Sequence, residues 1–375
     1  MEESQLSTTS GAEDDDPQPS TSNITEDDDS ESSSSSAEDE PMAKRHLTVE
    51  EVRGMWNLVK VYRQLGTREQ AIAFAEDRGM IPRTKMCQHH KKEMKIIYST
   101  NKTVGSFVCN KSHRRAKFRV SRAKGTLFDN IKILMPQVFY LMYAYAQKYS
   151  YDETIREDFS EREQCLSTST ISNWFNQYRE AVVKYQKHQQ SMKGHIGGMG
   201  KVVQVHASQF SKRKNKESGT RGLWILGMIE DGNEDLRLEA CTSNILSAEV
   251  LLPLIKKHVA EGTTIITDTS QAYDCLGDNG YIHRKMNHSD ENNHTVGEKV
   301  RAQRIQSHSQ WCAVKRFLSK DSYSNNSSNM DDLIYEYLWR REVKMKREDP
   351  FEELIHVINH SYKNHNPPLF FATVE

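Results

Sequence analysis

The sequence has no long apolar run, and its cysteines are few for its length. No stretch approaches the roughly 18 consecutive apolar residues that a transmembrane helix needs, and the start does not have the pattern of a signal peptide. Six cysteines in 375 residues do not form the dense framework of a disulfide-stabilised secreted domain. We therefore expect a protein of a reducing compartment, with no membrane partner and with enough chain for two or three domains.

Basic residues are absent from residues 1–42, which contain fourteen Asp or Glu and no Lys or Arg. The rest of the chain has 38 acidic residues against 51 basic ones, an excess of about 13 positive charges that suits a polyanion such as DNA. The acidic segment has too few large apolar residues to form a core, so we expect residues 1–46 to be a disordered tail. It is either a solubilising tail or a phosphorylatable mimic of nucleic acid.

Two short helices are expected in a helical segment at residues 47–84. Thr48 with Glu51, and Thr67 with Gln70, have the spacing of capping boxes before apolar positions at helical intervals. A helix-turn-helix and ordinary helix packing both fit this pattern.

Cysteine and histidine are paired twice in the next part of the chain. Cys87 precedes His90 as C-x2-H, and Cys109 precedes His113 as C-x3-H about twenty residues further on. Thiolate and imidazole at two such positions are ligands of a tetrahedral structural zinc ion, and the segment between them alternates as a hairpin does. The pattern predicts a zinc-ribbon-like module. The competing ligand is His89, and the alternative is a degenerate ribbon without metal.

A basic run lies within the same module, which we place at residues 85–128. Its positive side chains are interleaved with apolar ones, a pattern that suits phosphate contact as well as a solvated surface. The candidates for DNA contact are Arg114, Arg115, Lys117, Arg119, Arg122 and Lys124. A second cluster, further along the chain, is a candidate of the same kind and is also compatible with a nuclear import signal. It contains Lys212, Arg213 and Lys214.

Helical patterns continue through residues 129–195. A stripe at helical spacing predicts a helix whose apolar face belongs to a core rather than to stacked bases. This stripe is formed by Ile171, Trp174, Phe175 and Tyr178. Hydroxyls and amides lie off the stripe at the start of the helix, where they can contact base edges. They include Ser169, Thr170 and Asn173. We therefore predict a helix-turn-helix-like region here.

The period changes from helical to strand-like after a glycine-rich joint near residue 195. Three short strands, a helix and a buried strand that ends at Asp268 follow in that order. This order is the opening of an RNase H-like α/β domain, which we place at 196–365, with 366–375 as a tail. Such a domain carries its first carboxylate on the first strand, where this sequence has His206. The chain as a whole is predicted to be α+β and multidomain.

Four blocks in this domain point to a known family. They read VVQVHASQF, SAEVLLPLIKKHVAEGTTIITDTSQAYDCLGDNGYIHRKMNHS, WCAVKRFL and YLWRREVKMKREDPFEELIHVI. Together they resemble the Merlin superfamily of DDE transposases and its bacterial insertion-sequence relatives, and the resemblance covers about residues 48–365. That family cuts and joins DNA by metal-assisted attack of water, and then of a 3′ hydroxyl, on phosphodiesters. The resemblance implies DNA as partner and Mg²⁺ or Mn²⁺ as the cofactor of an active member.

The resemblance also implies where the three metal ligands of the family fall. The second aspartate matches Asp268. The first falls on His206, in a motif that usually reads Ile-Asp-Glu-Ser and here reads Val-His-Ala-Ser. The third, aligned through the basic residue Lys315, falls on His308, with Gln306 as the rival position.

Loss of the first carboxylate argues against catalysis. Mg²⁺ prefers carboxylate and water to imidazole, so His206 removes a negative charge and a bidentate ligand from the centre of the site. A transition metal held by His206, Asp268 and His308 is the other route to activity. The leading hypothesis is an inactive, transposase-derived nuclear DNA-binding protein that regulates transcription or chromatin, with chromatin proteins and a second copy as further partners. The alternatives are an active transposase or nuclease and a protein-interaction scaffold.

Overall fold

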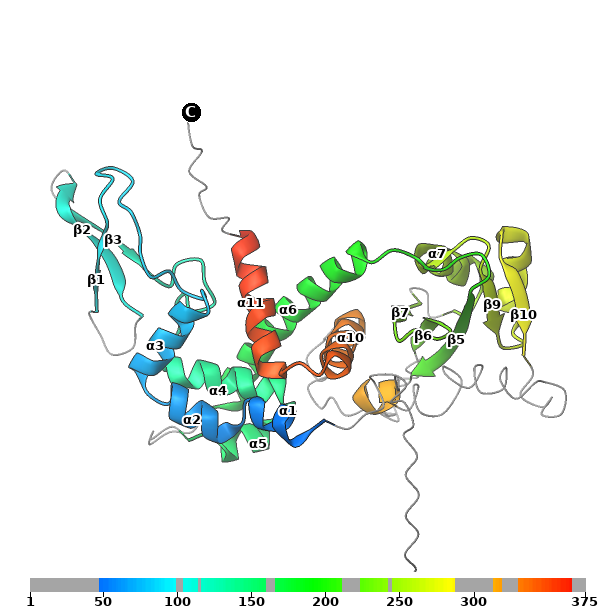
Figure 1. Ribbon diagram of the computed structural model, residues 1–375, viewed down its shortest axis with the longest axis horizontal. Coiled ribbons are helices and arrows are strands. Elements are labelled where there is room, and N and C mark those ends of the chain that lie inside the picture. Colours follow the sequence, from blue (N-terminus) through cyan, green and yellow to red (C-terminus); the bar gives the residue numbers. More distant parts are fainter. Residues whose placement is uncertain are drawn as a thin grey trace, which may run out of the picture. The chain divides into compact units, whose positions relative to one another are not determined.

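Figure 1 shows the chain as a computed structural model. The described residues are 47–98, 104–113, 116–159, 166–210, 223–241, 245–286, 313–318 and 330–365. The predicted tails, at 1–46 and 366–375, lie outside them. Within the described ranges, no helix combines the length and the apolar character needed to cross a membrane.

Helices from both ends of the described chain share one apolar core, and Figure 1 shows where they lie in the chain. They are α2 (Leu58–Leu65), α3 (Arg68–Asp77), α4 (Met135–Ala146), α5 (Tyr151–Arg156), α6 (Thr168–Met192), α10 (Met330–Lys346) and α11 (Pro350–His365). The short α1 (Val49–Gly54) precedes them and has no buried residue. Both predicted capping boxes form: Thr48 and Glu51 exchange bonds of 3.3 and 2.6 Å, and Thr67 and Gln70 exchange bonds of 3.2 and 3.1 Å. These caps satisfy backbone N–H groups that the first turn of a helix leaves unpaired.

The predicted division into modules differs from this arrangement. The sequence separates 47–84 from 129–195 and assigns everything from 196 to 365 to one α/β domain. In the structure the first two regions share a core, and α11 packs into it through Phe351 and Leu354. The reason is that all twelve residues of α4 are buried, so this helix needs neighbours on every side. Helix α11, which is distant from α4 in the sequence, packs against part of its surface.

A small antiparallel sheet of three strands follows α3. The strands are β1 (Lys95–Ile97), β2 (Ser106–His113) and β3 (Ala116–Ser121), in the order β1-β2-β3. The first two form the predicted hairpin. One face carries a small core that includes Phe107 and Cys109. We call the described residues between 85 and 121 the ribbon.

The β-rich middle of the chain forms a mixed sheet of five strands. The strands of this sheet are β5 (Val202–Phe210), β6 (Leu223–Glu230), β7 (Leu236–Ala240), β9 (Thr264–Thr267) and β10 (Ile282–Lys285). The helix α7 (Ala248–His258) precedes β9 in the sequence, and the 3-10 helix η1 (Gln271–Asn279) follows it. The short strands β4 (Ile196–Gly197) and β8 (Val259–Ala260) form a separate two-stranded sheet. The spatial order in the five-stranded sheet is β10-β9-β5-β6-β7. Strands β5, β6 and β7 are antiparallel, whereas β9 runs parallel to β5 and β10 parallel to β9. The predicted succession of three strands, a helix and a strand is confirmed.

Different helices pack on the two faces of this sheet. Val203, Val205 and Ala207 of β5 pack with α7 and η1. On the other face, Phe210 joins a cluster in which β6 and β7 pack against α10. Because successive residues of a strand point to opposite faces, His206 lies on the α10 side of the sheet with Phe210.

Candidate functional site: a Cys/His cluster, a basic face and the His206–Asp268 pair

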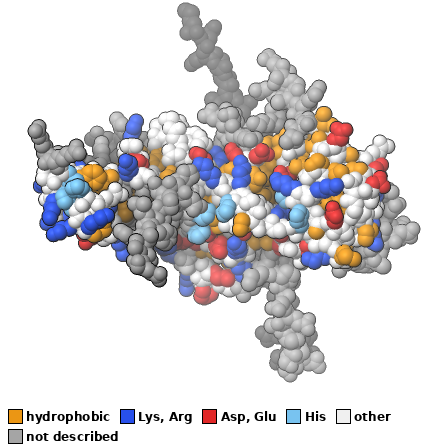
Figure 2. Space-filling view, turned by 90° about the horizontal axis from the view of Figure 1, so that it is seen from above, with side chains coloured by type: hydrophobic (Ala, Val, Ile, Leu, Met, Phe, Trp, Pro, Cys, Tyr) orange, Lys and Arg blue, Asp and Glu red, His pale blue; other side chains and the backbone are white. Residues whose placement is uncertain are grey.

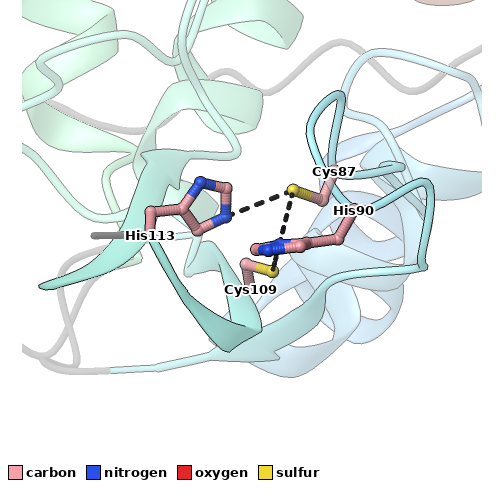
Figure 3. A group of neighbouring side chains, drawn as sticks. All are labelled: Cys87, His90, Cys109 and His113. Carbon is pink, nitrogen blue, oxygen red and sulfur yellow. Dashed lines mark hydrogen bonds between the residues drawn. The ribbon is translucent and has the colours of Figure 1, made fainter. Parts of the chain in front are cut away.

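The four predicted zinc ligands come together in the ribbon. The ligand atoms of Cys87, His90, Cys109 and His113 all lie within 4.8 Å of one another. Figure 3 shows the side chains converging from the loop before β1 and from β2. The sulfur of Cys87 lies 3.8 Å from Nδ1 of His90 and 3.3 Å from Nε2 of His113. The sulfur of Cys109 lies 3.3 Å from Nδ1 of His90. The rival residue, His89, is exposed and is not among the converging four.

These distances fit a tetrahedral zinc ion. Zinc lies about 2.3 Å from sulfur and about 2.0–2.1 Å from nitrogen, so sulfur and nitrogen ligands of one ion are roughly 3.6 Å apart. The three sulfur-to-nitrogen distances fall between 3.3 and 3.8 Å. Cys87 and Cys109 are buried, whereas His90 and His113 are partly exposed. The cluster could therefore hold a metal such as zinc.

Local backbone features bring the ligands together. In the loop, the N–H of Lys91 donates to the carbonyl of Cys87 at 2.8 Å, and Lys91 itself adopts a φ of 50°. The pairing of β2 with β3 is irregular between Val108 and Ser112. Val108 pairs with Arg119 and Ser112 pairs with Lys117, so four residues along β2 lie opposite only two along β3. In a straight strand, Cys109 and His113 would be about 13 Å apart. The extra residues shorten this path and bring His113 to the cluster.

The surroundings favour the metal-binding forms of two ligands. Burial alone raises the pKa of the Cys87 thiol, but the backbone at His90 and the charge of Lys91 are among the groups that hold it below its ordinary value. Burial, aided by the positive potential of His113, lowers the pKa of His90. Thiolate and neutral imidazole are the forms that bind zinc.

One face of the ribbon carries basic side chains. Lys95, Val108 and Arg119 are paired across the three strands, so their side chains lie on the same face. Lys117 lies two residues from Arg119 and shares that face. We call the exposed side chains of Lys95, Lys117 and Arg119 the basic face. Figure 2 shows Lys and Arg side chains beside histidines at the left of the view, where the ribbon lies.

Arg122 does not belong to this face, which corrects its prediction as a DNA contact. Its side chain is fully buried, and its guanidinium forms an ion pair with Glu76 of α3. The same group donates to the carbonyl of Pro82 at 3.0 and 3.2 Å and to that of Val104 at 3.1 Å. The alternation of side chains along β3 that exposes the basic residues ends with the strand at Ser121. The next residues, Arg122 and Ala123, are buried. Arg122 therefore ties the ribbon to the helical core.

The variants Arg119→Gln and Arg122→Gln are expected to separate binding from stability. Loss of the exposed Arg119 charge should weaken duplex binding and reduce its salt dependence, with the unfolding midpoint unchanged. Loss of the buried Arg122 charge leaves Glu76 and two carbonyls without their donor, which should cost roughly 3 kcal/mol of unfolding free energy. Urea unfolding and fluorescence anisotropy across a salt series measure the two effects. If Arg122→Gln were as stable as the unmodified protein but bound DNA weakly, Arg122 would be a DNA contact after all.

The start of α6 presents part of the predicted polar surface. Ser169 and Asn173 are exposed, whereas Thr170 is partly buried and lies 2.8 Å from the hydroxyl of the cap residue Ser167. The predicted apolar stripe is buried in the helical core, as expected of core residues. It consists of Ile171, Trp174, Phe175 and Tyr178.

Two predicted catalytic positions that the structure describes, His206 and Asp268, lie next to each other. His206 lies opposite Gly227 of β6, and Asp268 follows β9, which is parallel to β5. Nδ1 of His206 is 3.3 Å from Oδ2 of Asp268, and the two side chains are 22% and 23% exposed. Oδ1 of Asp268 accepts the N–H of Ser270 at 2.9 Å. Both oxygens of this carboxylate therefore already contact protein groups.

Residues beside this pair extend the polar site. The hydroxyl of Thr267 lies 2.8 Å from Nε2 of His283 on β10, and burial lowers the pKa of that imidazole, as does the charge of Lys285. The ammonium of Lys315 is exposed and lies 5.9 Å from the ring centroid of Phe210. Because Phe210 and His206 share a face of β5, Lys315 lies on the same side of the sheet as the pair.

Residues 191–320 match the ISXO2-like transposase domain. The matched range contains the described strands β4 to β10 and both members of the His206–Asp268 pair. It supports a transposase-like domain in this part of the chain. No curated protein matches the chain at a significant level.

The remaining predicted site residues fall in three places. In the transposase-like domain, the third-ligand candidates His308 and Gln306 lie outside the described residues. The same holds for the basic positions Lys212, Arg213, Lys214, Arg114 and Arg115. Lys124 is exposed after β3. Lys95 and His283 were not among the site residues predicted from the sequence. Strand pairing places Lys95 on the basic face. His283 lies in the second of the four sequence blocks quoted above.

Proposed function

We propose that the chain is a Merlin-type, transposase-derived DNA-binding protein that does not cut DNA. The match of residues 191–320 supports its origin. An RNase H-like fold for this domain is supported by the strand order β10-β9-β5-β6-β7, in which the first strand lies at the centre between an antiparallel hairpin and a parallel strand. This arrangement brings the middle of β5 next to the end of β9, where two metal ligands of an active enzyme would meet.

The pairing of His206 with Asp268 carries the proposal of inactivity. Two-metal phosphodiester chemistry needs hard, negative oxygen ligands that hold both ions and offset the charge that builds on the phosphate. His206 supplies an imidazole nitrogen instead, at 3.3 Å from the remaining carboxylate. A neutral imidazole gives no negative charge to the site, and a protonated one repels a metal ion. The pair therefore favours a closed polar contact over a divalent metal site.

DNA binding is supported by exposed groups away from that pair. The basic face offers three cations on one surface, and the start of α6 offers the hydroxyl of Ser169 and the amide of Asn173. Contacts of the first kind fix a protein on the phosphate backbone, and contacts of the second kind can read base edges. We propose that a structural zinc ion in the four-residue cluster holds the ribbon in shape. A DNA partner also implies a nuclear location in a eukaryotic cell.

A cleavage and binding assay of the full chain tests this function. We expect labelled duplex and single-stranded DNA to stay intact with Mg²⁺ or Mn²⁺, while the duplex is bound in a salt-dependent manner. Asp268→Ala should change neither result. Cleavage by the unmodified protein that disappears in Asp268→Ala would overturn the proposal of inactivity. Failure to bind DNA even at low salt would favour the scaffold alternative.

His206→Asp gives the same site a direct metal readout. The substitution places a second carboxylate beside Asp268, so the variant should lose stability through repulsion between like charges. Mg²⁺ at millimolar concentration should restore part of the unfolding midpoint, because the ion binds the folded form alone. His206→Asn, which adds no charge, is the control and should show no response to Mg²⁺. Equal responses of the two variants would mean that the pair does not occupy a metal position.

A further inference from the structure

Three histidines lie together where α6 packs against α11, on elements distant from the ribbon. The ring of His188 stacks on that of His360, with centroids 5.5 Å apart and an interplanar angle of 27°. The ring of Tyr185 meets His360 and His356 edge-on, at 5.2 and 5.8 Å. The hydroxyl of Ser361 donates to the carbonyl of Ala181 at 3.3 Å, so the two helices are in direct contact here.

The spacing of these histidines allows them to reach a shared metal ion by turning their rings, since their ligand atoms do not converge as those of the ribbon do. His356 and His360 are four residues apart on α11, so their side chains lie on the same face one turn apart. Two imidazoles bound to one tetrahedral zinc ion have ring centroids roughly 5 Å apart, given a metal-to-nitrogen distance of about 2.0–2.1 Å. The 5.5 Å between His188 and His360 is close to this value, as is the 4.5 Å between His90 and His113 in the ribbon.

The exposure of the cluster allows the final adjustment. His188 and His356 are exposed, and His360 is partly exposed. Exposed side chains change rotamer on the picosecond to nanosecond timescale, so the rings of His188 and His356 can turn toward an ion beside His360. Imidazole nitrogen is a ligand that zinc, copper and nickel accept readily.

We propose that His188, His356 and His360 bind one transition-metal ion, with Zn²⁺ as the reference ion, and that this ion joins the end of α11 to α6. The first half of α11 is held by buried residues such as Phe351 and Leu354. From residue 359 to residue 362 the helix is only partly buried. An ion at His356 and His360 adds a fixed contact where apolar packing becomes sparse.

Zinc titration of the full chain tests this site separately from the ribbon. With tight chelators removed, calorimetry should resolve an event of Kd about 10 µM or tighter that is absent in His360→Gln and present in Cys109→Ser. Zn²⁺ should also raise the unfolding midpoint of the unmodified protein more than that of His360→Gln. Hydrogen exchange of residues 359–362 should slow on zinc addition in the unmodified protein and not in His360→Gln.

Two controls make the result decisive. His195→Gln removes an exposed histidine outside the cluster and should leave the titration unchanged. His188→Gln removes the ligand from α6 and should abolish the binding event as His360→Gln does, since the ion needs both helices. Equal titrations of His360→Gln and the unmodified protein would overturn the proposal. An event weaker than about 100 µM would do the same, because it would mean an adventitious ion only.

Discussion

Replacement of Cys109 by Ser is expected to unfold the ribbon and leave the helical core intact. The ribbon has a core of four buried residues, and two of them, Cys87 and Cys109, are the thiols of the Cys/His cluster that we propose holds zinc. Zinc contributes about 10–16 kcal/mol to the folding of zinc-finger peptides, which equals or exceeds the stability of a typical domain. Without the ion, the few apolar side chains around Phe107 cannot hold three short strands together.

Two probes separate the ribbon from the rest of the chain in this variant. All five tryptophans lie outside the ribbon, so their fluorescence should report an unchanged core. Hydrogen exchange of residues 104–113 and 116–121 should accelerate by several orders of magnitude. A chelator should do the same to the unmodified protein.

The matched control for this prediction is Cys275→Ser. Cys275 is a partly exposed cysteine of η1, away from the cluster, and its replacement should leave exchange in the ribbon unchanged. If Cys109→Ser kept native exchange rates in the ribbon, the strands would not depend on a metal. The degenerate-ribbon interpretation would then hold.

Short-range patterns in the sequence predicted most of the site. The capping boxes at Thr48 and Thr67 involve residues three apart, and the strand order around Asp268 follows local periodicity. The four residues of the Cys/His cluster follow from two short motifs joined by one hairpin. Each of these features depends on neighbours in the sequence, and there the local physical rules are strong.

Features that depend on distant contacts were not predictable in this way. Arg122 reads as one more residue of a basic run, and its burial follows from Glu76 and Pro82, which lie about forty residues earlier. The packing of α11 against α4, and the approach of His188 to His360, join segments that are far apart in the sequence. An amphipathic pattern predicts that a helix buries one face, but it does not predict which other element packs against that face.

Glu336→Gln is expected to weaken the junction between the sheet and the helical core. Helix α10 contacts both, since Ile334 and Leu338 pack with the sheet and Trp339 packs with the helices. Glu336 lies on this helix, buried between the guanidinium of Arg179 at 2.7 Å and that of Arg340 at 2.8 Å. Removing its charge leaves two cations without a buried counter-charge, which should cost roughly 3–5 kcal/mol of unfolding free energy.

The pH dependence of stability gives an independent readout of the same group. Burial by itself raises the pKa of Glu336, but Arg340 and Arg179 together lower it from 4.5 to about 2. A carboxyl with a depressed folded-state pKa adds stability that is fully present above its unfolded value and is lost as the pH falls through the folded one. The unmodified protein should therefore lose about 3 kcal/mol between pH 4.5 and pH 2 from this group alone.

Urea unfolding at a series of pH values measures this effect. Glu336→Gln should be less stable at pH 7, and its stability should fall less steeply between pH 4.5 and pH 2 than that of the unmodified protein. Glu69→Gln is the matched control, because the side chain of Glu69 is 79% exposed and lies 3.7 Å from Arg68. Screening by solvent should keep its effect below about 1 kcal/mol. Parallel pH curves for Glu336→Gln and the unmodified protein would show that the two arginines do not hold this carboxyl in its ionised form.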